Sequence, residues 1–459
     1  MPTPTVGHQE PGRSRHSSGQ HWAVRGRVRR ALFADGRGPW TTAGAITLAN
    51  LLIRGIWISV FLTRPVSDFA VYYGAAERWA AGDGYTLDGE HATMAWPPGW
   101  PLLLRLLFEV TGPSITAGAI LQVVLSSLTA GLVVLLGYRC FAGWLRRPLL
   151  LGAIAGVAYT LQPADWARNS VLGTEPLFGL LLVAGLFAVV SWPTRRGAVL
   201  AGALWGLGSL VRGTLLLGFP LIGLAALARG LGWRRALVHL GLAAAAIAVV
   251  LAPWTARNLL LSGEFVPVSS NLGQNLWQGT QGDVGYWWSD DPDRNPVVRA
   301  ESESENNRIG RDAALAYWAE HPAEFLARAP VKLAGLYAGN DEALHWLHQT
   351  AEMTGPVKER WLAVADLAYW LVMAFGVVGA VLVWRVRRSV AVTLVGMIGY
   401  TSAVFCWFLT WDRFRAPLMP LFCVLAALTV VCTLTRDPTR QPEPARQPEP
   451  TASDRTDPS

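Results

Sequence analysis

Apolar runs of about 20 residues, long enough to cross a bilayer core as helices, recur along this 459-residue chain and alternate with short clusters of charge. Lipid offers no hydrogen-bond partner to the backbone, so a spanning segment is a helix or belongs to a closed barrel. The sequence lacks the short alternating segments of a barrel. Only 15% of the residues are charged, against about 25% in soluble domains. The sequence therefore predicts an all-α polytopic membrane protein.

The apolar runs predict about ten transmembrane helices within a membrane domain at residues 41–435. The expected spans are Thr41–Thr63, Ser114–Tyr138, Pro148–Gln162, Thr174–Trp192, Gly197–Leu210, Gly213–Ala228, Ala236–Pro253, Trp361–Trp384, Ser389–Leu409 and Ala416–Leu434. Residues 1–40 are polar and basic, and residues 436–459 are Pro-rich with a repeated RQPEP motif. We expect both tails to be disordered and cytoplasmic.

The distribution of arginine predicts the orientation of the spans. With the N-terminus in the cytoplasm, every basic cluster falls on the cytoplasmic side, as the positive-inside rule requires. These clusters are the two tails and residues 139–147, 195–196, 229–235 and 385–388. Two long polar loops, 64–113 and 254–360, then lie outside the membrane. The net charge of +7 therefore reflects orientation in a membrane and not nucleic-acid binding.

The first outer loop carries an acidic residue, Asp68, five residues after the first span ends. The next residues show apolar and aromatic side chains at helical spacing, which is typical of a helix lying at the membrane surface. Gly82 and Gly84 end this segment, and Pro97 and Pro98 begin a second one. Asp68 lies at the start of the first helix, where it is either an N-cap or a reactive carboxylate at the membrane boundary.

Several cations lie near the outer ends of spans, where a lipid phosphate would also lie. They are Arg168, Arg212, Arg257, Arg413, Arg415 and, in the long loop, Lys332. Arginine is suited to bidentate contacts with phosphate. Each of these residues could equally be a cation that stabilises a helix end. Arg54 lies within the first span, one turn after Asn50. It either pairs inside the protein or contacts an anionic lipid headgroup.

The sequence assigns no metal site, although a divalent metal stays open. His91 beside Glu90 is a weak pattern, and the four cysteines lie in or at the edge of apolar runs without metal-ligand spacing. The H-E-x-x-H, G-x-S-x-G and P-loop motifs are missing from the sequence. This argues against metalloproteases, α/β-hydrolases and nucleotide-driven pumps.

Five segments in order carry a resemblance to a known family. They are Asp68 with Tyr72-Tyr73, Gly82, Gly84-Tyr85 and WPPGWPLLL; TEPLFGLLL at 174–182; GLGSLVRGTLLL at 206–217; APWTARNLLLSGEFVPVSSNLGQNLWQG at 252–279; and DRFRAPLMPLF at 412–422. Over about residues 45–435 the chain resembles the polyprenyl-phosphate-sugar-dependent glycosyltransferases of the C superfamily. Within that superfamily it resembles the bacterial branch related to protein O-mannosyltransferases and the lipid A aminoarabinose transferase.

The resemblance implies inverting transfer of a hexose or pentose from a polyprenyl-phosphate donor to a cell-envelope glycan, lipid or protein. The reaction would occur on the outer face of a bacterial cytoplasmic membrane, with Asp68 as general base. The expected donor-phosphate ligands are Arg212, Arg257, Arg413, Arg415 and Arg54, and the expected substrate contacts are Tyr72, Tyr73, Glu175 and Trp277. Protein O-mannosyltransferases carry an Asp-Glu pair where this chain has Asp68-Phe69, so the acceptor stays open.

Two other functions stay open. One is a transporter or flippase of lipid-linked glycans, although the sequence shows no internal repeat of the kind typical of transporters. The other is a non-catalytic membrane scaffold or a glycan ligase of related fold, and the ligase would use a diphosphate-linked glycan.

Overall fold

A computed structural model describes residues 36–282, 284–350 and 353–435 of the chain. The predicted C-terminal tail lies outside the described residues, as does nearly all of the N-terminal one. The described part consists of helices joined by loops, and its β-structure is a single isolated bridge between Thr86 and Ala92. The all-α prediction is confirmed.

The helices begin and end at the following residues. They are α2 Gly38–Val60, α3 Asp68–Ala81, α4 Gly99–Thr111, α5 Ile115–Phe141, α6 Pro148–Thr160, α7 Pro163–Ala167, α8 Glu175–Ser191, α9 Arg195–Val211, η1 Gly213–Leu215, α10 Pro220–Ala228, α11 Trp233–Ser262, α12 Leu272–Gln281, η2 Pro296–Arg299, α13 Glu303–Glu320, α14 Pro322–Tyr337, α15 Asp341–Thr350, α16 Gly355–Val386, α17 Arg388–Phe405, η3 Asp412–Leu418 and α18 Met419–Thr435.

Six segments in the described part are long and apolar enough to cross a membrane: α2, α5, α11, α16, α17 and η3 with α18. The remaining four predicted spans correspond to the shorter helices α6, α8, α9 and α10. The predicted span Gly213–Ala228 differs most, because its regular part is η1 followed by α10, which has nine residues. Nine residues of α-helix extend about 14 Å. Pro220 has no backbone N–H to continue a helix from Gly213, so the helix restarts at the proline.

The central helices of the bundle are α5 and α18. In each, 72% of the residues in the most apolar 18-residue stretch are buried, compared with 28% in α11 and 33% in α2 and α16. Small residues allow close approach here, because a Cβ added at Gly152 of α6 would collide with the backbone of α5 at Val134. Asn50 of α2 joins the same core through Thr160 and Ser127.

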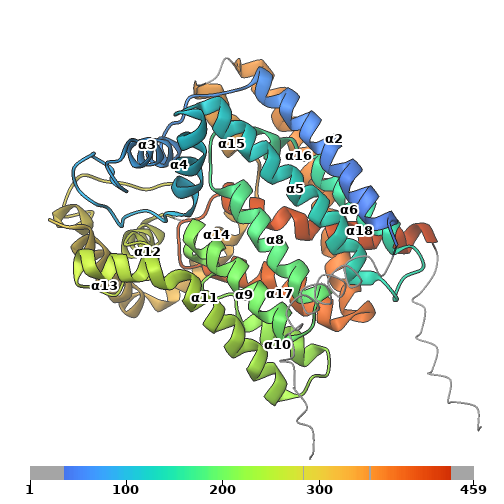
Figure 1. Cartoon of the computed structure of the whole chain (residues 1–459). Helices are drawn as coiled ribbons and strands as arrows, with labels where there is room; N and C mark the ends of the chain where they lie inside the picture. Colours follow the sequence, from blue (N-terminus) through green and yellow to red (C-terminus); the bar gives the residue numbers. More distant parts are fainter. Residues whose placement is uncertain (1–35, 283, 351–352, 436–459) are drawn as a thin grey trace, which may run out of the picture.

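The first outer loop folds into two helices that pack on each other, α3 and α4, as the sequence predicts. Trp100 fixes this pair to the bundle: its side chain is fully buried, and Nε1 donates to the Leu172 carbonyl at 2.8 Å. The second outer loop, in which the sequence shows no spanning run, contains the helices α12 to α15. Figure 1 shows α3, α4, α12 and α13 at one side of the bundle, with α15 near the ends of α2 and α5.

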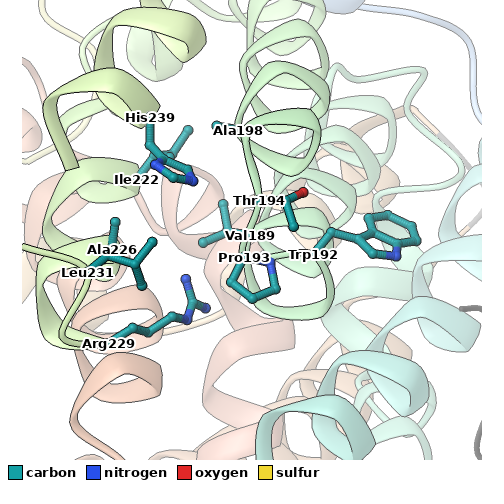
Figure 2. A pocket seen from close by; sticks show the side chains of 10 residues that line it. All are labelled: Val189, Trp192, Pro193, Thr194, Ala198, Ile222, Ala226, Arg229, Leu231 and His239. Carbon is teal, nitrogen blue, oxygen red and sulfur yellow. The ribbon is translucent and has the colours of Figure 1, made fainter. Parts of the chain in front are cut away.

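Three of the predicted cytoplasmic loops lie together at one end of the bundle. Arg387 donates to the carbonyls of Arg139 at 3.2 Å and Cys140 at 2.6 Å, and Arg229 lies close to both Arg387 and Cys140. Figure 2 shows a small pocket beside Arg229, with His239 and Trp192 also in its lining. This pocket lies at the C-terminal end of α8, and the helix extends about 25 Å from its first residue, Glu175, to its last, Ser191.

Candidate active site

Asp68 is the first residue of α3, and its carboxylate faces the body of the protein. Ser67 occupies the N-cap position with a positive φ of 51° and makes no capping hydrogen bond through its side chain. A non-glycine residue in this region is strained, so the chain turns sharply just before Asp68. Asp68 is therefore not an N-cap, and its Oδ2 lies 3.2 Å from Arg413 Nη1. The Asp68 side chain is 35% exposed.

Arg413 is a buried cation, only 5% exposed, that connects three carboxyl groups from distant parts of the chain. Its Nη1 contacts Asp68, its Nε lies 3.0 Å from Glu175 Oε1, and its Nη1 also lies 3.8 Å from Glu342 Oε1. The guanidinium lies over the ring of Phe69 at 5.1 Å. Arg413 is thereby held in one orientation.

A second arginine continues this arrangement beyond Glu175. Arg212 follows the last residue of α9 and forms an ion pair with Glu175 Oε1 through Nη2. Its Nε donates to Thr174 Oγ1 at 2.6 Å. Asp68, Arg413, Glu175 and Arg212 thus form an alternating row of charges, which we call the charge row. Glu175 Oε2 is buried and has no hydrogen-bond partner within the described residues.

A second buried network lies next to the charge row. Arg168 pairs with Asp165 at 2.8 Å and lies 3.8 Å from Asp412, the neighbour of Arg413 in sequence. Arg54 supports this network from α2, because its Nη1 donates to the carbonyl of Asp165 at 2.6 Å and to the side chain of Asn169 at 2.7 Å. Arg54 therefore pairs inside the protein through Nη1.

Burial changes the acidity of two groups beside the row. Burial raises the pKa of the Glu342 carboxyl to about 7; the Arg413 charge opposes this shift, and the Asp412 charge adds to it. The pKa of the buried Tyr72 hydroxyl is raised above its usual value by burial and by the negative charge of Asp68. Tyr72 therefore lies within electrostatic range of the Asp68 carboxylate.

The other predicted site residues lie elsewhere. Arg415 is 1% exposed, lies over Tyr369 at 4.0 Å and donates to the carbonyl of Leu336 and the side chain of Asn340. These contacts fix the segment that joins α14 to α15. Arg257 donates to the carbonyl of Thr93 at 2.6 Å and lies over Trp254.

The remaining residues singled out from the sequence are two aromatic residues and a lysine. Tyr73 packs its ring against Phe108 of α4, and Trp277 is half-buried on α12. Buried Lys332 contacts the carbonyls of Gly279 at 2.5 Å and Phe408 at 3.1 Å. Tyr73 thus joins α3 to α4, and Lys332 joins α14 to α12 and to the segment that follows α17.

Sequence reasoning missed Glu342 and Asp412. Asp412 stands next to Arg413 at the start of the last apolar run. A carboxylate beside an arginine at the end of a predicted span is a feature that the sequence alone could have indicated. Glu342 lies in the long polar loop without a motif. Its weak signal is the spacing of Glu342 and Trp346, which places both on one face of a helix.

The described residues contain no group of three or more His, Cys, Asp and Glu side chains placed to hold a metal ion. His91 pairs with Asp88 at 2.8 Å on the exposed surface of the first outer loop.

The fold is similar to that of a solved oligosaccharyltransferase. It matches the archaeal oligosaccharyltransferase AglB from Archaeoglobus fulgidus in complex with an inhibitory peptide and a dolichol-phosphate, with a TM-score of 0.50, 14% identity and coverage of 86% of this chain and 50% of that one. The Archaeoglobus fulgidus oligosaccharyltransferase in the apo form gives a TM-score of 0.50, 14% identity and coverage of 87% of this chain and 51% of that one. This chain thus spans about half the length of AglB.

ArnT from Cupriavidus metallidurans bound to undecaprenyl phosphate is a further neighbour, with a TM-score of 0.41, 14% identity and coverage of 87% of this chain and 78% of that one. No protein-family model matches the sequence, and a search of curated proteins gives no match. At this level of identity the match to AglB establishes a shared fold.

Proposed function

We propose that this chain is a membrane glycosyltransferase of the C superfamily that moves a sugar from a polyprenyl-phosphate donor to a cell-envelope acceptor. In this proposal Asp68 is the general base of an inverting displacement. Such a reaction needs one base to take the proton of the acceptor hydroxyl as it attacks the anomeric carbon. The leaving group is already a phosphate, so a strong general acid is not required.

The charge row is the observation that carries this proposal. Asp68 is 35% exposed, whereas its partner Arg413 is 5% exposed. The carboxylate is therefore held on one side by a buried cation and remains open to a substrate on the other. This is the arrangement that a general base needs, because its orientation must be fixed before the acceptor arrives.

The arginines of the row are suited to the donor phosphate. Arg212 is 13% exposed and Arg413 lies beside Asp68, so we assign the phosphate to these two residues. Glu175 then orients both arginines and does not itself bind sugar. Arg54 and Arg415 each donate from Nη1 to a backbone carbonyl of the protein. We therefore assign a structural role to both. Arg257, with Tyr72, Tyr73 and Trp277, remains a proposed contact of the wider substrate site.

The distribution of basic loops supports an active site on the outer face. The loops of Arg139, Arg229 and Arg387 lie together at one end of the bundle. The C-terminal end of α8 lies at this basic end, beside Arg229. The charge row lies at the N-terminal end of α8, where Glu175 is the first residue. By the positive-inside rule the basic end is cytoplasmic. We therefore place the charge row at the outer face of a bacterial cytoplasmic membrane, with both termini in the cytoplasm.

The fold shared with AglB adds support by analogy, because that enzyme was solved with a dolichol-phosphate. A fold alone does not define a reaction, and the same match favours a second candidate, transfer of a lipid-linked oligosaccharide. The two candidates differ in the donor and can use the same base.

The test is a donor panel with purified, detergent-solubilised protein. Polyprenyl-monophosphate sugars and diphosphate-linked oligosaccharides are compared for turnover by the wild type and Asp68→Asn. Asp88→Asn is the matched control, because Asp88 lies in the same loop on the exposed surface. We expect one monophosphate sugar to be consumed, with a loss on the order of 10²–10⁴-fold in Asp68→Asn only.

Turnover of diphosphate-linked glycans alone would establish the second candidate. If neither donor class is consumed, while liposomes containing the protein move a lipid-linked glycan between leaflets, the chain is a flippase and the proposal fails.

A further inference from the structure

Glu342 is a buried carboxyl group that reaches the charge row from the second outer loop. It is the second residue of α15, and its side chain is 1% exposed. Its Oε1 lies 3.8 Å from Arg413 Nη1, the same nitrogen that lies 3.2 Å from Asp68 Oδ2. One N–H-bearing atom of Arg413 is therefore shared between Asp68 and Glu342.

The position of Glu342 is fixed by its own helix and by the segment before Arg413. Trp346, one turn further along α15, donates from Nε1 to Glu342 Oε1 at 2.8 Å. The backbone N–H of Glu342 donates to Asp412 Oδ2 at 3.4 Å. The ring of Trp346 meets that of Phe69, the residue after Asp68, edge to face at 6.2 Å. Helix α15 is thus docked directly behind the proposed base.

We propose that Glu342 is a positioning residue whose protonation state controls how firmly Arg413 holds Asp68; this inference rests on the proposed function of Asp68. When Glu342 is neutral, Arg413 Nη1 forms its ion pair with Asp68. When Glu342 is ionised, it competes for the same nitrogen and draws it away from Asp68, because opposite charges attract strongly in a buried site.

The surrounding charges determine when the change occurs. The charged groups that act on Glu342 are Arg413 and Asp412 from η3, Arg168 after α7 and Glu175 from α8. Lys358 of the packed helix α16 pairs instead with Asp341 at 2.8 Å. Because burial and Asp412 raise the pKa of Glu342 to about 7, its carboxyl group changes charge near neutral pH.

The ionised form also disfavours the donor. The two networks hold carboxyl groups at Asp68, Glu175, Glu342, Asp412 and Asp165 and guanidinium groups at Arg413, Arg212 and Arg168. Ionised Glu342 therefore adds one negative charge close to Arg413, at the place proposed for the donor phosphate. Both effects lower kcat/KM as pH rises through the titration of Glu342.

The first experiment compares pH profiles of transfer for the wild type, Glu342→Gln and Glu359→Gln. Glutamine keeps the oxygen that accepts from Trp346 and cannot ionise, so it imitates neutral Glu342. Glu359 is an exposed residue of α16 and serves as the control. We expect kcat/KM of the wild type and control to fall roughly tenfold between about pH 6 and about pH 8, and that of Glu342→Gln to stay level over this range. The same fall in Glu342→Gln would overturn the inference.

A second measurement does not depend on turnover. Infrared difference spectra of the wild type minus Glu342→Gln should show a protonated carboxyl band that disappears as pH rises through about 7. If no carboxyl group titrates in this range, the inference is wrong, whatever the activity. If the band titrates as expected and no lipid-linked sugar is consumed, the proposed function fails, while Glu342 stands as the titrating partner of Arg413.

Discussion

Arg413 Nη1 lies 3.2 Å from Asp68 Oδ2, although the two residues are 345 positions apart in the sequence. Asp68 begins the first helix of the first outer loop, and Arg413 stands just before the last helix of the bundle. This contact brings the two ends of the membrane domain together at one point. The proposed active site depends on this contact between Asp68 and Arg413.

Arg413→Lys should retain the charge and lose the geometry. Lysine is a point charge and cannot contact Asp68 from one nitrogen and Glu175 from another, as the guanidinium does. We expect kcat to fall on the order of 10²-fold, since misplacement of a reacting group by about 1 Å has this effect. Steady-state kinetics with the donor found in the panel would measure the loss, and a variant with unchanged kcat would contradict the role of Arg413.

Glu175→Gln should destabilise the protein. It leaves two buried arginines, Arg212 and Arg413, without their shared carboxylate. Breaking a buried ion pair on one side costs about 3–5 kcal/mol. Glu109→Gln is the matched control, because its pair with Arg105 is substantially exposed and should contribute less than about 1 kcal/mol. Unfolding in detergent tests this ranking, which equal losses in the two variants would refute.

Arg54→Met and Arg212→Met should separate structure from substrate binding. Arg54 donates to the loop of Asp165 and Asn169, so its loss should lower thermal stability and leave the KM for the donor unchanged in the protein that remains folded. Loss of Arg212 should raise the KM at least tenfold, because a charge-assisted contact to phosphate contributes about 1.5–3 kcal/mol. The reverse pattern would show that Arg54 binds the donor.

Stability should depend on pH through Glu342. Its pKa in the folded protein, about 7, lies above the ordinary value of 4.5, so the folded state binds the extra proton between these values. The free energy of unfolding should therefore fall as pH rises from about 4.5 to about 7, by roughly 3 kcal/mol. Unfolding curves of the wild type and Glu342→Gln over this range provide the measurement. The variant should lack this contribution, and identical pH dependence in both proteins would count against the buried carboxyl.

Much of the fold could be predicted from the sequence, because membrane spans are defined by length and hydropathy. The first span was expected at Thr41–Thr63 and is found at Gly38–Val60. Local backbone chemistry limits this accuracy. Pro220 shortens one predicted span to nine residues, whereas α11 runs through Pro253 and continues to Ser262. A proline restarts a helix in one place and is tolerated in the other, and hydropathy does not distinguish the two cases.

The site could be predicted only in part, because its members meet through tertiary packing. Asp68, Arg212, Glu175 and Arg413 each lie near a span end, so a shared membrane face was foreseeable. Their order in the charge row was not, because it depends on which spans are neighbours. Glu342 was missed for the same reason: α15 buries it through contacts with α7, α16 and η3.

The central claim is that Asp68 acts in the chemical step and not in donor binding. The most direct test is a single-turnover experiment with donor already bound to the wild type and to Asp68→Asn. Both proteins should bind the polyprenyl-phosphate sugar with affinities within about threefold, and transfer in the variant should be slower by about 10²–10⁴-fold. An Asp68→Asn protein that binds donor and transfers sugar at the wild-type rate would contradict the account.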